Sequence, residues 1–230
     1  MPTIKVNDIN MYYEIHGEGE PLVLIVGLGA DISEYVKTIS LLAKSYKVVA
    51  FDNRGAGRTE KPDSIYTIEM MADDTAELMK KLGIERANII GHSMGGQIAL
   101  QVAIRHPGRV NKLIVVSSSA RSIRNWIISF FGWMRIIPLF SSKYPQPRFA
   151  FLRQHNAVLA GNCFDKLHQL SLPIVIMHGR KDKIVPFAAS EAMHRELAHS
   201  RLVAFKSGHL FFFFTKERQA FVDAVEKFLG

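Results

Sequence analysis

Six short apolar runs recur along the chain, and each ends at a turn. They occupy residues 22–26, 47–51, 87–90, 112–116, 173–177 and 201–205. Strands that are buried on both faces of a parallel sheet have this near-continuous apolar character. Between the runs, apolar residues recur at helical spacing over 32–44, 68–82, 94–106, 187–199 and 216–229. Strands that alternate with helices predict a doubly wound, mostly parallel α/β sheet.

Two parts of the chain depart from this alternation. Residues 2–7 and 10–16 alternate polar and apolar side chains around a turn, which predicts an antiparallel hairpin and brings the sheet to eight strands. Residues 121–170 carry three prolines and no strand-like run. We therefore predict one core built from 1–120 and 171–230, with 121–170 inserted as a short helical cap.

Composition excludes several classes of protein. The single cysteine, Cys163, rules out a disulfide within the chain and argues against a cysteine-based metal site. The formal charge of +8 favours anionic surfaces or substrates, but it is spread without blocks of like charge or a zinc-finger or RNA-binding motif, so no nucleic-acid partner is expected. The start of the chain has no signal-peptide pattern, and no apolar run is long enough to cross a bilayer. We expect a cytoplasmic protein.

A serine stands between glycines where the run 87–90 gives way to a helical pattern. Residues 91–95 read Gly-His-Ser-Met-Gly, which fits G-x-S-x-G. On a sharp strand-to-helix turn, the hydroxyl of Ser93 is exposed at the end of the sheet, and small neighbours let the backbone pass closely. The motif predicts a nucleophile; the alternative is a small residue that merely fills a crowded turn.

A serine nucleophile needs a general base, and His209 is the candidate. It follows a glycine at the end of the run 201–205, so it reaches the sheet edge where Ser93 lies. Of the other histidines, His92 is expected to point away from the serine, and His178 precedes a glycine at a strand end. The remaining six, His16, His106, His155, His168, His194 and His199, are expected to be solvated in turns or helices.

The base in turn needs a carboxylate that fixes its tautomer. Asp182 is the first acid after the run 173–177, and the order serine, acid, histidine is the one expected on this kind of sheet. Asp52 is the rival acid, although an ion pair with Arg54 is its expected role. An oxyanion hole is predicted from the backbone N–H groups of Met94 and Leu28.

Taken together, these motifs resemble those of the α/β-hydrolase fold family, in its serine esterase and enol-lactonase-like branch. The similar segments are VGLGAD (26–31), FDNRGAGRT (51–59), YTIEMMADDTAELMKKLGI (66–84), GHSMGG (91–96), LPIVIMHGRKDKIVP (172–186) and SGH (207–209). The resemblance implies an α/β-hydrolase fold and a hydrolase without a cofactor. A serine at position 93 separates the chain from family members that use an aspartate nucleophile.

Three features depart from the family pattern. Val26 stands where the family often has a histidine that steadies the oxyanion loop, so the support of this loop is open. The insertion is shorter than many caps of the family. After His209 the chain continues with four phenylalanines, 211–214, which we interpret as packing under the last helix.

The insertion begins with an amphipathic segment, 122–137, whose apolar face is wide. We predict that it lines the pocket, with Trp126, Phe130 and Met134 as walls. The alternative is a surface helix in contact with lipid.

The sequence thus predicts a serine hydrolase that acts on small to medium apolar esters or lactones through an acyl-enzyme on Ser93. A small-molecule receptor, a cofactor-free haloperoxidase and an acyltransferase on the same scaffold remain alternatives. No metal or organic cofactor is expected, nor is membrane contact, and a homodimer is left open.

Overall fold

The computed structural model describes residues 2–123, 143–213 and 215–230. Its centre is an eight-stranded sheet in the order β1-β2-β4-β3-β5-β6-β7-β8. The strands are β1 (Thr3–Val6), β2 (Ile9–His16), β3 (Pro21–Ile25), β4 (Lys47–Phe51), β5 (Ala87–His92), β6 (Val110–Val116), β7 (Ile174–Gly179) and β8 (Ser200–Phe205). β2 pairs antiparallel with β1 and β4, and the other neighbours are parallel. The predicted hairpin, strand number and mostly parallel sheet are confirmed.

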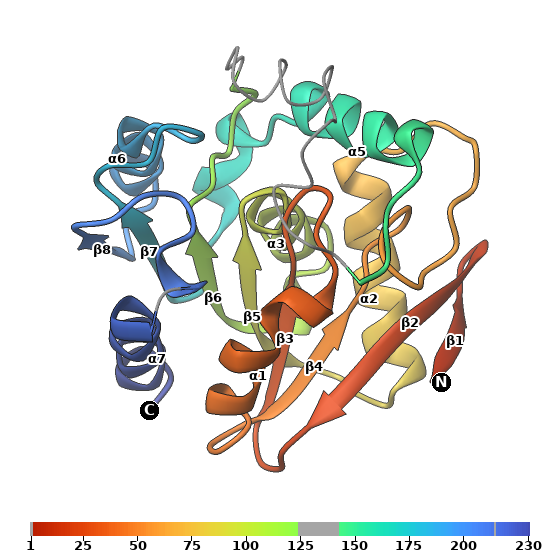
Figure 1. Cartoon of the computed structure of the whole chain (residues 1–230). Coiled ribbons are helices and arrows are strands. Elements are labelled where there is room, and N and C mark those ends of the chain that lie inside the picture. Colours follow the sequence, from red (N-terminus) through yellow and green to blue (C-terminus); the bar gives the residue numbers. More distant parts are fainter. Residues whose placement is uncertain (1, 124–142, 214) are drawn as a thin grey trace.

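Helices cover both faces of the sheet (Figure 1). The α-helices are α1 (Val36–Leu42), α2 (Ile68–Lys81), α3 (Met94–Arg105), α5 (Arg148–Ala160), α6 (Phe187–Glu196) and α7 (Thr215–Leu229). Short 3₁₀ helices are η1 (Ile32–Tyr35), η2 (Pro107–Arg109), η3 (Phe164–Gln169) and η4 (Phe211–Phe213). Thr67 caps α2 through the Met70 amide, and Gly83 follows its end at a φ of 69°, as the sequence indicates.

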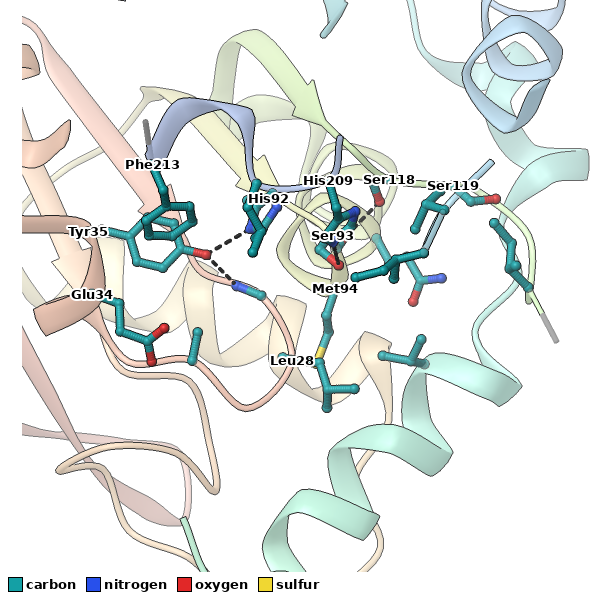
Figure 2. A pocket seen from close by; sticks show the side chains of 18 of the residues that line it. Leu28, Glu34, Tyr35, His92, Ser93, Met94, Ser118, Ser119, His209 and Phe213 are labelled. Atoms are coloured by element: carbon teal, nitrogen blue, oxygen red, sulfur yellow. Dashed lines mark hydrogen bonds between the residues drawn. The ribbon is translucent and has the colours of Figure 1, made fainter. Parts of the chain in front are cut away.

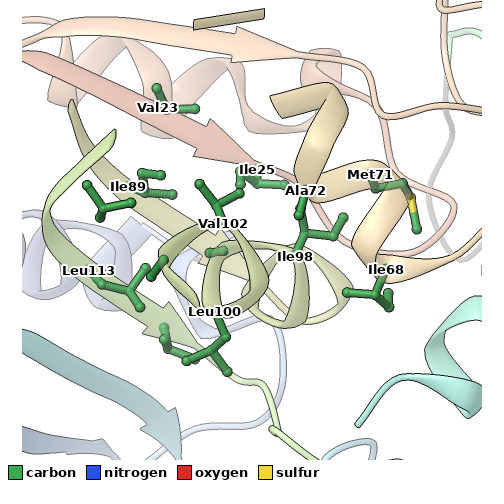
Figure 3. Close-up of a cluster of buried hydrophobic side chains, with 14 of the residues drawn as sticks. Val23, Ile25, Ile68, Met71, Ala72, Ile89, Ile98, Leu100, Val102 and Leu113 are labelled. Carbon is green, nitrogen blue, oxygen red and sulfur yellow. The ribbon is translucent and has the colours of Figure 1, made fainter. Parts of the chain in front are cut away.

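The core lies in two layers, because alternate side chains of each buried strand face opposite sides of the sheet. Val23 and Ile25 of β3 pack with α2 and α3 on one face (Figure 3). Leu22 and Leu24 of the same strand pack with α1 and α7 on the other. Burial on both faces explains why the strands read as continuous apolar runs.

Between β6 and β7 the described residues form α5 and η3. In Figure 1, α5 lies across the top of the molecule, above the carboxyl ends of the parallel strands. The segment 124–142 lies outside the described residues, so most of the predicted amphipathic helix is not covered, and the division into core and cap stays a prediction.

Two of the four phenylalanines that follow His209 pack as expected, and Phe214 lies outside the described residues. Phe211 and Phe212 are buried, and both rings contact Phe221 of α7. Phe213 instead reaches the pocket described below.

Candidate active site

Ser93 occupies a strained turn between β5 and α3. Its φ of 55° and ψ of −118° lie where residues other than glycine are rarely found. A Cβ atom at Gly91 would overlap the carbonyl of Gly95, and one at Gly95 would overlap the carbonyl of Ile25. The close passage of backbone that the G-x-S-x-G motif predicts is therefore present, and it holds the serine at the carboxyl edge of the sheet.

A chain of hydrogen bonds joins the three predicted side chains. His209 Nε2 lies 3.0 Å from Ser93 Oγ, and His209 Nδ1 lies 2.7 Å from Asp182 Oδ2. Asp182 is 8% exposed and His209 is 9% exposed. Three residues that are far apart in the sequence thus meet in one place, at the end of β5, after β7 and after β8. Figure 2 shows two of them, Ser93 and His209, side by side.

The Asp182 carboxylate is held from several sides. Its Oδ1 accepts the backbone N–H groups of Ile184 and Val185, at 2.8 and 2.9 Å. Its Oδ2 lies 3.0 Å from Nε2 of His178, a fully buried residue. Burial acts to raise the pKa of Asp182, but hydrogen bonds from His178 and His209 outweigh it and hold the pKa well below its usual range. Asp182 is therefore ionised at neutral pH.

Asp52, the rival acid, has a different environment from the one expected. Its Oδ2 accepts the backbone N–H and the Nε of Arg58, at 2.8 and 3.1 Å, and its Oδ1 accepts the Ile32 amide. The predicted ion pair with Arg54 is wrong, because Arg54 pairs with Asp8 and Asp74 instead. Asp52 braces the loop after β4, as predicted, but through another arginine.

Comparison with known protein families shows which family the chain belongs to. Residues 20–162 match the family model described as the alpha/beta hydrolase fold. The chain belongs to the α/β-hydrolase fold family.

Relatives of this α/β hydrolase carry hydrolase names. RutD of Azorhizobium caulinodans, assigned as a carbamate hydrolase, is 35% identical over 122 residues, which span 53% of this chain and 46% of RutD. The serine hydrolase BPHL of Homo sapiens is 27% identical, with 86% of this chain and 76% of BPHL covered. The enol-lactonase of Burkholderia xenovorans LB400 has the same fold, with a TM-score of 0.89, 99% coverage of both chains and 24% identity.

The predicted oxyanion loop of the α/β hydrolase has supports that the sequence analysis missed. Leu28 and Met94 line the same pocket as Ser93. Before Leu28, the Gly27 amide donates to the hydroxyl of Tyr35 at 3.3 Å. That hydroxyl also lies 2.8 Å from His92 Nδ1, so the loop amide and the imidazole share one buried oxygen (Figure 2).

The hydrogen bond of His92 goes to Tyr35 and not to Ser93, in line with the expectation that His92 points away from the serine. The His92 ring lies beside that of His209, with the centroids 5.0 Å apart. Burial, followed by the proximity of His209, lowers the pKa of His92 well below its usual value, so the ring is neutral. The neutral His92 ring bonds to the Tyr35 hydroxyl, whereas the His209 ring lies within hydrogen-bond distance of Ser93 Oγ.

The pocket beside Ser93 is mainly apolar. Its described apolar lining includes Leu28, Ile123, Phe151, Val158, Ile184, Val185, Leu210 and Phe213. The predicted walls Trp126, Phe130 and Met134 lie outside the described residues. Sequence reasoning missed Phe151 and Val158 of α5, although their spacing of seven residues, two helical turns, places them on one helix face.

His155 and Cys163 are two further buried side chains. His155 is buried, at 7% exposure, and not solvated as expected. Burial raises the pKa of the Cys163 thiol to about 12, so this cysteine is no thiolate nucleophile. Within 2–123, 143–213 and 215–230, no group of three or more His, Cys, Asp or Glu side chains is arranged to hold a metal, and no helix is long and apolar enough to cross a membrane.

Proposed function

We propose that this α/β hydrolase cleaves carboxylic esters or lactones with small to medium apolar acyl groups, through an acyl-enzyme on Ser93. The observation that carries the proposal is the continuous hydrogen-bond chain from Ser93 through His209 to the buried Asp182, which opens into an apolar pocket. The names of the family and of its relatives support hydrolase chemistry.

In the first half-reaction, Ser93 Oγ attacks the carbonyl carbon while His209 Nε2 takes the hydroxyl proton. Asp182 holds Nδ1 and stabilises the imidazolium. The backbone N–H groups of Leu28 and Met94 bind the negative oxygen of the tetrahedral intermediate. When the intermediate collapses, His209 gives its proton to the leaving alkoxide, and an acyl ester remains on Ser93.

In the second half-reaction, His209 removes a proton from water, and the resulting hydroxide attacks the acyl carbon. The carboxylic acid leaves as the proton returns to Ser93. The buried ionised Asp182 keeps the histidine in the required tautomer in both halves.

Replacing Ser93 by alanine tests the proposal on a panel of p-nitrophenyl esters and lactones. Loss of one member of such a triad costs on the order of 10⁴- to 10⁶-fold in rate, while the fold is retained because alanine fits the turn as serine does. A fluorophosphonate probe is expected to label the wild type and not the variant. Retention of a tenth of the activity by a purified, folded Ser93→Ala protein would refute the role of Ser93.

Two further arms of this assay address the alternatives. Transfer of the acyl group to an added alcohol in preference to water would favour an acyltransferase. Tight binding of esters without turnover and without probe labelling would favour a receptor.

A further inference from the structure

Glu34 is the one carboxyl group among the described residues that line the pocket. It lies in η1, four residues beyond Ala30 on the far side of the oxyanion loop, and Figure 2 places it below Tyr35. Pockets for small molecules are mainly apolar, and their few polar groups fix the orientation of the ligand. A carboxyl group in such a pocket favours a ligand that carries a hydrogen-bond donor or a positive charge.

The capping role of Glu34 uses only one of its two oxygens. Its Oε1 accepts the backbone N–H of Asp31 at 3.4 Å, which completes the capping box of η1. Its Oε2 is buried and has no hydrogen-bond partner in the part of the chain that the structure describes. A buried polar atom without a partner is costly, and a bound ligand is one way in which it is satisfied.

The charges around Glu34 indicate which charge a bound ligand group should carry. Burial first, and then the negative charges of Asp31 and Asp52, raise the pKa of Glu34 to about 8, and no cation is among the causes. Asp52 has its own arginine, and Asp31 holds the Ser33 amide and hydroxyl. A cation placed at Glu34 Oε2 would offset this repulsion and favour the ionised form of Glu34, whereas an anion would add to the repulsion.

We propose that Glu34 forms an amine-binding subsite, so that the preferred esters or lactones carry a primary ammonium group in an otherwise apolar acyl chain. An ammonium donates hydrogen bonds to Oε2 and gains from the negative field, whereas a hydroxyl gains only the hydrogen bond. The net charge of +8 acts over long distances and is screened beyond about 8 Å in physiological salt. At Glu34 itself, the neighbouring charges that raise the pKa are those of carboxyl groups.

This substrate class rests on the proposed ester hydrolysis, and matched substrates test it. Methyl 6-aminohexanoate is compared with methyl heptanoate, and methyl 3-aminopropanoate with methyl butanoate, because the members of each pair differ only in the terminal ammonium or methyl group. The readout is the ratio of kcat/KM for the amine to kcat/KM for its partner.

Glu34→Gln is the test variant, because the amide oxygen still accepts the Asp31 N–H and keeps the cap. Since hydrogen bonds to a charged group are worth about 1.5–3 kcal/mol, the ratio is expected to fall by about tenfold or more for at least one pair. Glu18→Gln, which makes the same substitution at an exposed loop residue, is the control and should keep the wild-type ratio. Equal ratios in wild type and Glu34→Gln would overturn the amine subsite.

A binding measurement separates the subsite from turnover. Calorimetric titration of Ser93→Ala with n-hexylamine at pH 7 is expected to show binding, which weakens by about tenfold when Glu34→Gln is added. If no ester is hydrolysed, the proposed function fails while this titration still decides the subsite. Equal affinity in both variants, or no binding to either, would overturn the subsite alone.

Discussion

Replacing Tyr35 by phenylalanine removes one oxygen atom and leaves two buried groups without their partner. The Gly27 amide loses its acceptor, and His92 Nδ1 loses its hydrogen-bond partner. Tyr35 is 1% exposed and His92 is 4% exposed, so water does not replace the hydroxyl readily. Each unsatisfied buried group costs about 1–3 kcal/mol, and the bond from Gly27 is long. We therefore expect the free energy of unfolding to fall by about 2–4 kcal/mol.

The same change is expected to slow catalysis, because Gly27 precedes the proposed oxyanion donor Leu28. Loss of a complete oxyanion donor costs about 10²- to 10³-fold in kcat, and a displaced loop costs less. We expect Tyr35→Phe to lower kcat by about 10- to 100-fold with little change in KM, since the oxyanion forms only in the transition state. Urea unfolding gives the stability and p-nitrophenyl butyrate hydrolysis gives the rate.

Tyr46→Phe is the matched control. Tyr46 is also buried and packs in the same apolar layer as Tyr35, but its hydroxyl lies outside the network around Gly27. This variant should keep kcat. Our reasoning fails if Tyr35→Phe retains the wild-type kcat, or if its loss of rate appears in KM rather than in kcat.

The remaining predictions concern the acid, the pH dependence and the pocket. Asp182→Asn should lower kcat by about 10⁴-fold, whereas Asp52→Asn should mainly lower stability; the reverse result in folded proteins would exchange their roles. Because the pKa of Glu34 rises from its ordinary 4.5 to about 8 on folding, the native state keeps a proton that the unfolded chain has lost, so the free energy of unfolding should fall as pH rises through this window. Urea titrations across that range should show a smaller fall for Glu34→Gln. Values of kcat/KM should rise by roughly fourfold per methylene from acetate to hexanoate esters until the pocket is full, and Phe151→Ala should reduce this slope. If 122–137 lines the pocket, the hydrolysis rate should not jump when the substrate concentration passes the solubility limit. A jump would favour contact of this segment with lipid.

The sheet and the three residues at its edge could be predicted because both depend on local signals. Strands buried on both faces read as apolar runs, and the carboxyl ends of parallel strands converge whatever the intervening sequence is. Ser93, Asp182 and His209 each follow such a run closely, so their meeting needs no knowledge of the helices.

The arginine that pairs with Asp52 could not be predicted from local signals, because the pairing depends on the path of a loop. Gly55 and Gly57 have φ values of 86° and 51°, in the left-handed region, and the chain between them turns back on itself. The turn returns Arg58 to Asp52, while Arg54 extends to Asp8 in the turn between β1 and β2 and to Asp74 of α2. Proximity in the sequence favoured the wrong arginine.

The burial of His155 and the pocket walls from α5 were missed for a related reason. The apolar and polar positions of α5 are weakly separated, so the sequence does not reveal which face of the helix is covered. The structure lays α5 over the strand ends, with Phe151 at the pocket and its ring stacked near that of His155, at 6.2 Å. Burial of this helix is decided by the sheet below it rather than by its own pattern.

The supports of the proposed oxyanion loop explain how Val26 is tolerated where the family often has a histidine. The Gly27 amide is held by Tyr35, the Val26 carbonyl by the Asn53 side chain at 2.9 Å, and the Gly29 amide by Gln154 at 3.2 Å. These partners lie 8, 27 and 125 residues away along the chain, beyond the reach of any local motif. Because three elements share the support, removal of one partner shifts the loop without releasing it. For this reason we expect Tyr35→Phe to slow the reaction by less than the loss of a complete oxyanion donor.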